Sequence, residues 1–177
     1  MKNQNALLIV FALASATALA ACAQEPDTAA RKTPATMPAM ALETETSAAA
    51  ALPLVVVSKS PSCGCCGRWV EHMRAAGFEL EVHNMDNMSP VKERVGVPPG
   101  KGSCHTAEVA GYFIEGHVPA EDVKRLLAER PDARGLVVAG MVMGSPGMEM
   151  PGGRVQPYRV ELVAKDGSTT VYARHGD

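Results

Sequence analysis

The sequence lacks an excess of basic residues. It contains 17 Lys and Arg side chains and 19 Asp and Glu side chains, which gives a formal charge of −2 at pH 7. Proteins that bind nucleic acids present a basic face, so this balance argues against a nucleic-acid partner. The sequence also has no internal repeat and no complete phosphate-binding loop. The glycine-lysine segment at residues 96–103 is one residue too short for such a loop, and it follows a helical pattern where a strand is required.

The N-terminal apolar run is too short for a comfortable membrane span. Residues 6–20 form a run of about 15 residues, whereas a transmembrane helix needs about 20. Lys2 precedes the run and small residues follow it, which is typical of an export signal. The segment that ends in Cys22 resembles the bacterial lipobox, in which the cysteine is diacylated. We therefore expect a lipoprotein-type signal peptide at residues 1–21 and lipidation of Cys22; ordinary cleavage nearby, without lipidation, is the alternative.

Export would place the mature chain in the periplasm, anchored to the outer membrane through the lipid on Cys22. Removal of residues 1–21 leaves 16 basic and 19 acidic side chains, a formal charge of −3. The envelope is oxidising, so cysteines there form disulfides unless something keeps them reduced. Export also separates the protein from ATP and NADPH, which argues against nucleotide-dependent chemistry.

The mature chain is expected to have two parts. Residues 22–52 are rich in Ala, Thr, Pro and Glu, contain two Met residues and have no sustained periodicity, which predicts a disordered tether. Residues 53–175 have the size of one folded domain. Periodicity and turn signals predict strands at about 53–58, 79–83 and 107–114, an apolar run at 136–138, a hairpin over 158–173, and helices at about 65–76, 89–96 and 119–130.

This order of elements predicts an α/β domain. The spacing Cys63-x-x-Cys66 at the first strand-to-helix turn matches the thioredoxin-like layout. The expected fold is therefore a thioredoxin-like domain with an extra helix near residues 119–130 and a C-terminal β-hairpin. Three of the five cysteines fall on that turn, at a helix N-terminus. There the unpaired N–H groups and the helix dipole favour thiolate over thiol.

A metal site would explain the third cysteine of the turn, because Cys65 could serve as a metal ligand. Cys63 and Cys66 have the spacing of a redox disulfide, but an additional thiol at Cys65 would promote scrambling during exchange. Cys104 lies in the loop before the third predicted strand, a loop that lies against the CxxC turn in thioredoxin-like folds. Four soft thiolates favour Cu(I), with Zn(II) as the competitor. Two structural disulfides, Cys63–Cys104 and another pair, are the alternative.

Further candidate ligands follow in the sequence. His105 comes directly after the fourth of these cysteines, and His117 stands at the entry to a predicted helix. Imidazole suits Cu(II) as well as Cu(I), so either histidine could support a change of oxidation state. Met143 and Met148 lie in a loop rich in Gly, Met and Pro and offer thioether, a soft ligand. Core packing is the alternative use of these methionines, and Met141 in particular is expected to be buried.

Four motifs follow one another along the chain: Ser60-Pro61-Ser62-Cys63-Gly64-Cys65-Cys66-x-x-Trp69, Ser103-Cys104-His105-Thr106-Ala107, Gly111-Tyr112-x-x-Glu115-Gly116-His117-Val118-Pro119 and Gly144-Ser145-Pro146-Gly147-Met148-Glu149. With them the chain resembles the CopG-type copper-resistance proteins over nearly all of residues 53–175. The resemblance implies an exported thioredoxin-like domain that handles excess copper, with interconversion of Cu(I) and Cu(II) as a further role. The copper ligands that it implies are Cys63, Cys65, Cys66 and Cys104.

The resulting hypothesis is an envelope copper-binding protein for copper resistance and homeostasis. Its expected partners are copper ions and periplasmic proteins that donate or accept copper. Two alternatives stay open. A thiol-disulfide oxidoreductase would use Cys63 and Cys66 as its catalytic redox pair and would not need Cys65 or Cys104. A periplasmic copper metallochaperone would transfer copper rapidly to a partner without redox cycling.

Overall fold

The computed structural model describes residues 51–176. The predicted signal peptide at residues 1–21, the lipidation site Cys22 and nearly all of the predicted tether at 22–52 therefore lie outside the described residues. Within the part that is described, no helix combines the length and the apolar character that a membrane span requires. The elements are β1 (Val55–Lys59), α1 (Gly64–Ala75), β2 (Leu80–Asn84), α2 (Ser89–Val95), β3 (His105–Val109), β4 (Tyr112–Glu115), α3 (Ala120–Glu129), β5 (Ala133–Val137), β6 (Tyr158–Ala164) and β7 (Thr169–His175).

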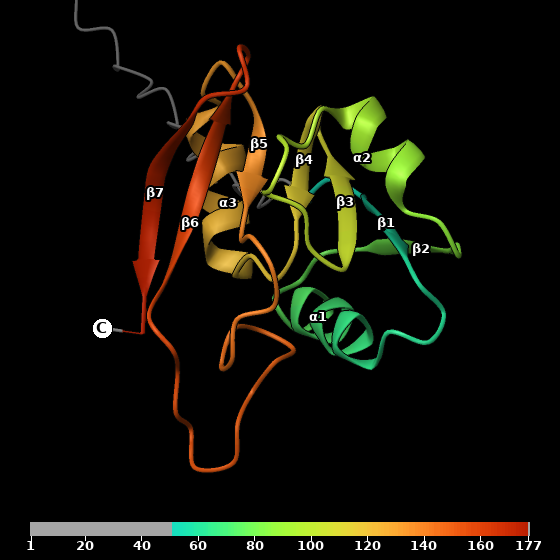
Figure 1. Ribbon diagram of the computed structural model, residues 1–177, viewed down its shortest axis with the longest axis vertical. Helices are drawn as coiled ribbons and strands as arrows, with labels where there is room; N and C mark the ends of the chain where they lie inside the picture. Colours follow the sequence, from blue (N-terminus) through green and yellow to red (C-terminus); the bar gives the residue numbers. More distant parts are fainter. Residues whose placement is uncertain (1–50, 177) are drawn as a thin grey trace, which may run out of the picture. The chain divides into compact units, whose positions relative to one another are not determined.

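The strands form one sheet in the order β2-β1-β3-β4-β5-β6-β7 (Figure 1). The pairs β1–β2 and β4–β5 are parallel, and the other neighbours are antiparallel. The α/β class, the additional helix α3 and the C-terminal hairpin β6–β7 are confirmed. The apolar run at 136–138 belongs to strand β5. The thioredoxin-like layout itself stays a prediction.

The single strand predicted over residues 107–114 is wrong, because the chain folds back on itself within it. β3 and β4 pair in an antiparallel hairpin, and the residues between them are Ala110 and Gly111. Both have positive φ values, 48° and 86°. A two-residue hairpin turn of type I′ has positive φ at both positions, and Ala110 carries none of the Asn or Asp signal that usually marks such a turn. The mostly apolar character of the segment concealed the turn.

The main core lies on one face of the sheet, under α1 and α3. Alternation along the strands turns Val55 and Val57 of β1 and Ile114 of β4 toward this face, where they meet Trp69 of α1 and Leu126 of α3. All five are fully buried. Burial of an apolar side chain of this size is worth about 1.5–3 kcal/mol, so this layer holds α1 firmly against the sheet.

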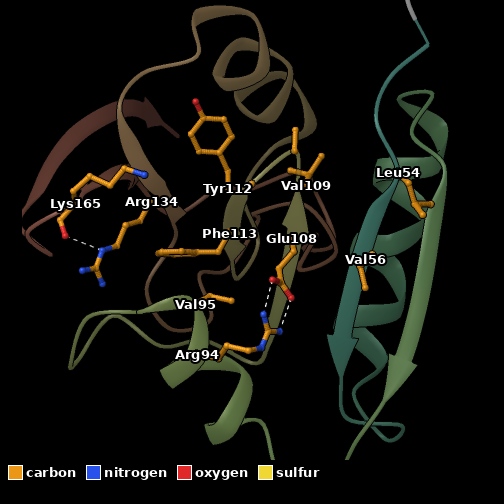
Figure 2. Close-up of a pocket in the computed structure, with 12 residues that line it drawn as sticks. Leu54, Val56, Arg94, Val95, Glu108, Val109, Tyr112, Phe113, Arg134 and Lys165 are labelled. Carbon is orange, nitrogen blue, oxygen red and sulfur yellow. Dashed lines mark hydrogen bonds and ion pairs between the residues drawn. The ribbon is translucent and has the colours of Figure 1, made fainter.

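The opposite face of the sheet carries α2 and a smaller apolar cluster of Phe113, Val137 and Val163, with Val95 and Val97 packed against it. An open groove of about 440 Å³ adjoins this cluster. Figure 2 shows Arg94 in this groove, donating two hydrogen bonds to Glu108, at 2.7 and 2.8 Å. None of the cysteines lines the groove. The chemistry predicted from the sequence therefore belongs to another part of the domain, at the N-terminal end of α1.

Candidate metal centre

The turn between β1 and α1 presents three cysteines. The N–H of Cys63 donates to the carbonyl of Ser60 at 3.1 Å, and α1 begins one residue later. Helical spacing then turns Cys66 and Trp69 inward, where both are fully buried. Cys63 and Cys65 are half-buried. The turn therefore anchors one sulfur in the core and leaves two near the surface.

Cys63 and Cys66 form a disulfide, with an S–S distance of 2.04 Å. This is the pair that the CxxC spacing predicts; the alternative bridge from Cys63 to Cys104 is absent among the described residues. Cys65 and Cys104 are free thiols, and Sγ of Cys65 lies 3.4 Å from Sγ of Cys63. The turn thus contains a redox pair with a third sulfur in contact with it.

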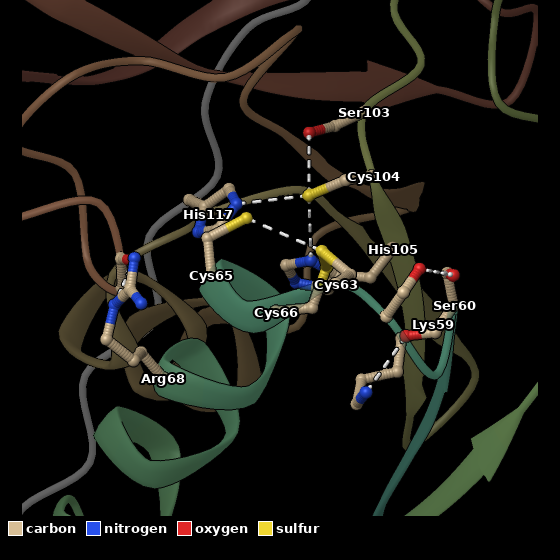
Figure 3. The surroundings of a disulfide bond; sticks show 12 residues. Lys59, Ser60, Cys63, Cys65, Cys66, Arg68, Ser103, Cys104, His105 and His117 are labelled. Atoms are coloured by element: carbon tan, nitrogen blue, oxygen red, sulfur yellow. Dashed lines mark hydrogen bonds between the residues drawn. A yellow bond between two sulfur atoms is a disulfide. The ribbon is translucent and has the colours of Figure 1, made fainter.

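Cys104 reaches this turn from the loop that precedes β3. The sulfur atoms of Cys63, Cys65, Cys66 and Cys104 all lie within 4.8 Å of one another (Figure 3). Burial, followed by the proximity of Cys65, raises the pKa of the Cys104 thiol to about 11. Cys104 is therefore a thiol at neutral pH, and a metal that binds its sulfur has to displace the proton.

His117 lies on the other side of Cys104. Its Nε2 is 3.1 Å from Sγ of Cys104, and its Nδ1 is 2.7 Å from the carbonyl oxygen of Pro146. A carbonyl can only accept, so Nδ1 carries the proton and Nε2 presents its lone pair toward the sulfur. Burial lowers the pKa of His117, which keeps the ring neutral. A backbone carbonyl that fixes the tautomer in this way is typical of histidines that bind metals.

His105 is also brought to the site, but it is more deeply enclosed. Its side chain is fully buried, with ring centroids 4.4 Å from Trp69 and 5.0 Å from His117. Its Nδ1 lies 3.6 Å from Sγ of Cys104, and its Nε2 has no hydrogen-bond partner among the described residues. Burial, with a smaller contribution from His117, lowers the pKa of His105 to about 3. Both imidazoles are therefore neutral near pH 7, the form that binds metals.

The site has two halves, which we name by the elements that carry them. The turn half consists of Cys63, Cys65 and Cys66 at the N-terminal end of α1. The hairpin half consists of Cys104, His105 and His117 at the open end of the β3–β4 hairpin. One donor atom from each member of the hairpin half also lies within 4.8 Å of the others. Thiolates suit Cu(I) and Zn(II), and imidazoles extend the set to Cu(II).

The backbone of the loop between β5 and β6 is held against both halves. Figure 1 shows this loop running beside α1. The Nε of Arg68 donates to the carbonyl oxygen of Gly147 at 2.9 Å, and Pro146 accepts the bond from His117. Gly147 has a φ of 84°, and a Cβ added to it would lie 2.7 Å from both the carbonyl oxygen of Cys65 and the amide nitrogen of Trp69. Only glycine permits so close an approach of two backbones.

The methionines of this loop lie less deep than its backbone. Met143 is 42% exposed and Met148 is half-buried. Their role as ligands stays a prediction. The expectation that Met141 is buried is wrong, because 61% of it is exposed. The loop is held by hydrogen bonds and glycine contacts, so it needs no apolar side chain at that position.

Two supports of the site were not identified from the sequence. Nε1 of Trp69 donates to the carbonyl oxygen of Val118, 2.8 Å away, and ties α1 to the residue after His117. Arg68 ties α1 to the loop between β5 and β6, as described above. The motif spacing hinted at Trp69, but the partners of both bonds are backbone carbonyls, and the sequence carries no signal for those.

Comparison with known proteins identifies relatives of this chain. A family model described as "Protein of unknown function, DUF411" matches residues 101–148. Two solved structures, "Copper resistance protein copG- Form 1" and "Copper resistance protein copG- Form 2", are each 44% identical to the chain. The alignment with the first covers 71% of this chain and 99% of that one, with a TM-score of 0.67. For the second the values are 70%, 98% and 0.66.

No curated protein matches the chain. The solved structures nevertheless suffice to place it, because they are similar over nearly their whole length and at high identity. The resemblance inferred from the four sequence motifs is confirmed: this chain belongs to the family of the copper resistance protein CopG.

Proposed function

We propose that this protein binds copper for copper resistance and homeostasis, and that Cys63, Cys65, Cys66 and Cys104 hold Cu(I). A copper-related function is supported by the family to which the chain belongs and by the cysteine cluster. The observation that carries the finer proposal is the approach of four sulfur atoms to within 4.8 Å of one another. Soft thiolates favour Cu(I), and thiolates can bridge, so the cluster has room for more than one ion.

The disulfide adds a redox step to this proposal. In the reduced protein the thiols of Cys63 and Cys66 each give one electron to one of two Cu(II) ions. The products are the Cys63–Cys66 disulfide, two Cu(I) ions and two protons. The neutral imidazoles of His105 and His117 are donors that suit Cu(II) before this transfer. The pair has to be reduced again before the turn half can bind copper with all of its sulfurs.

A thiol-disulfide oxidoreductase is the second candidate, and the disulfide at the start of a helix is the observation that favours it. In that function Cys63 and Cys66 exchange electrons with a protein disulfide, and Cys65 and Cys104 are dispensable. Under copper binding, Cys104 is required. The two functions can therefore be distinguished at Cys104, which copper binding requires and disulfide exchange does not.

The proposed location is the periplasm, with a lipid anchor at Cys22 in the outer membrane. It is supported by the signal pattern at residues 1–21 and the lipobox-like segment. Copper donors or acceptors in the same compartment are the proposed protein partners. Mass spectrometry of the mature N-terminus tests the anchor: a diacylated Cys22 is expected, and a mature chain that starts elsewhere would exclude it.

Titration of the reduced protein with Cu(I), in competition with a chromophoric Cu(I) chelator, tests the proposed function. We expect tight, near-stoichiometric binding in the wild type and much weaker binding in Cys66→Ser and in Cys104→Ser. His83→Asn is the matched control, because His83 is half-exposed and pairs with Glu81 away from the cysteines. Unchanged affinity in both cysteine variants excludes the site. Elemental analysis of protein purified without oxygen separates copper from zinc, and turnover of a disulfide substrate that survives Cys104→Ser favours the oxidoreductase.

A further inference from the structure

A carboxylate with no assigned role lies directly behind the hairpin half. Glu115, the last residue of β4, is fully buried. Its Oε1 accepts a hydrogen bond from the backbone N–H of Ser103 at 2.5 Å, and its Oε2 accepts one from the hydroxyl of Thr106 at 2.7 Å. Nζ of Lys92, on α2, lies 2.5 Å from Oε1 and 3.0 Å from the Thr106 hydroxyl. Every oxygen of the carboxylate is thus engaged.

The partners of Glu115 stand at fixed places relative to the donors. Ser103 and Thr106 immediately flank Cys104 and His105. The side chain of Glu115 therefore forms hydrogen bonds to both ends of the segment that carries these two candidate metal ligands. Thr106 is also the cross-strand neighbour of Glu115 in the β3–β4 ladder. The chain continues from Glu115 through one glycine to His117. A single carboxylate therefore connects all three residues of the hairpin half.

Stability alone gives little reason to bury this charge. An ion pair taken out of water costs desolvation that its attraction barely repays, and well-packed apolar residues often do as well or better. A buried and fully satisfied polar network does, however, fix one arrangement of the groups that it joins. The N–H of Ser103 precedes β3, whose first residue is His105, so it makes no bond of that ladder. Without the carboxylate, the N–H of Ser103 would have no hydrogen-bond acceptor among the described residues.

A second Lys–Glu pair in the same region serves as a comparison. Nζ of Lys101 lies 2.5 Å from the carboxylate of Glu161 on β6. The two pairs share residue types and distance, but Glu161 makes no hydrogen bond to the segment that carries Cys104 and His105. Loss of the Glu161 pair removes an ion pair and leaves the donors in place.

We propose that Glu115 is a positioning residue of the metal site: it clamps the segment from Ser103 to Thr106 and so sets where Cys104 and His105 meet the turn half. The proposal rests on the proposed function, since it assigns Glu115 to the same copper site. Partners that orient metal ligands from outside the coordination sphere typically contribute about 10- to 100-fold to metal affinity.

Two double variants of the full-length protein separate clamping from charge. Lys92→Met/Glu115→Gln and Lys92→Met/Glu115→Leu both remove the ion pair, but only the glutamine keeps an oxygen for the Ser103 N–H and an amide for the Thr106 hydroxyl. We expect the leucine variant to bind Cu(I) about 10- to 100-fold more weakly than the wild type. The glutamine variant should stay close to the wild type, as should Glu161→Gln. Equal Cu(I) affinities in the glutamine and leucine variants would overturn the proposal.

A measurement without metal keeps this test independent of the proposed function. Hydrogen exchange of the Ser103 amide, followed by NMR, should be slow in the wild type and in the glutamine variant and faster in the leucine variant. If the wild type binds Cu(I) weakly, the proposed function fails, and the exchange rate of the Ser103 amide alone tests the clamp. An exchange rate in the leucine variant equal to that of the wild type would then overturn the clamp proposal. If the leucine variant does not fold, Thr106→Val replaces it, because it removes one hydroxyl from the same clamp. Unchanged Cu(I) affinity and unchanged Ser103 exchange in that variant would then overturn the clamp.

Discussion

The two halves of the site are built on different principles. The turn half holds its sulfurs by covalent chemistry that can change: Cys63 and Cys66 are joined, and Sγ of Cys65 lies 3.4 Å from Sγ of Cys63. The hairpin half holds its donors by buried hydrogen bonds and packing. His117 is fixed by the carbonyl of Pro146, and His105 is enclosed against Trp69.

This difference assigns separate tasks to the halves. Under the proposed function, oxidation of the turn half removes two sulfur donors, whereas the hydrogen bonds of the hairpin half involve neither Cys63 nor Cys66. If copper binds as proposed, the redox state of the turn half sets how many sulfur donors are available to it. The loop that carries Gly147 lies against both and holds them together.

The largest expected effect comes from closing the disulfide. We expect the Cu(I) affinity of the oxidised protein to fall about 10³-fold below that of the reduced protein. Each of the two lost sulfurs should cost at least the roughly 10- to 100-fold that an outer-shell partner contributes, and 10³-fold corresponds to about 4 kcal/mol. Competition with a Cu(I) chelator measures the affinity, and thiol counting verifies the redox state. Equal affinities of the two forms would show that Cys63 and Cys66 are not copper ligands, because Cys65 stays a free thiol in both.

Gly147→Ala tests the bridge between the halves and has the next largest expected effect. A side chain there forces a left-handed residue, at about 1–2 kcal/mol, and adds a clash with the backbone of α1, at about 1–3 kcal/mol. We expect the free energy of unfolding, measured in urea, to fall by about 3 kcal/mol. Gly152→Ala is the matched control, because its φ is 83° but its Cβ would meet nothing within 4 Å. Equal losses in both variants would mean that the approach of the loop to α1 is not tight.

The smallest expected effect concerns the pH dependence of the hairpin half. The pKa of His105 is about 3 in the folded protein and 6.5 without the protein environment. Between these values the unfolded chain binds a proton that the folded one does not. The free energy of unfolding should therefore fall as the pH falls below 6.5, by up to about 1.4 kcal/mol per pH unit from this group.

Urea unfolding of the metal-free protein at pH 7 and pH 5.5 measures this slope. His105→Phe removes this titrating group and should make the slope shallower; burial also lowers the pKa of His117 and of His72, and these two groups keep part of the slope. His83→Phe, which replaces a half-exposed histidine, is the matched control. A slope that is the same in His105→Phe and in the wild type would show that His105 is not held neutral by burial.

The sequence predicted one half of the site more fully than the other. The spacing of Cys63, Cys65 and Cys66 between an apolar strand and a helical pattern is local, so the turn half and its disulfide follow from nearby residues. The approach of Cys104 depends on how β3 pairs with β1, and only the resemblance and the expected layout indicated it. The hairpin turn at Ala110 was missed because it lacks the usual polar signal.

The supports of the site were beyond sequence reasoning for a physical reason. Glu115 stands in an apolar segment as a single charge, and nothing local to it shows that its partners are Lys92, on a separate helix, and a backbone N–H. The bonds from Trp69 and His117 likewise end on carbonyl oxygens, which every residue has. Contacts of this kind are fixed by tertiary packing, and the residue types in the sequence do not predict them.

X-ray absorption spectroscopy at the copper edge, on the reduced protein loaded with Cu(I), tests the central claim most directly. The claim is that sulfur atoms from both halves hold the metal. A first coordination shell dominated by sulfur in the wild type, with fewer sulfur neighbours in Cys104→Ser, is the predicted result. A shell composed of nitrogen and oxygen, or one that is identical in the variant, would contradict the account.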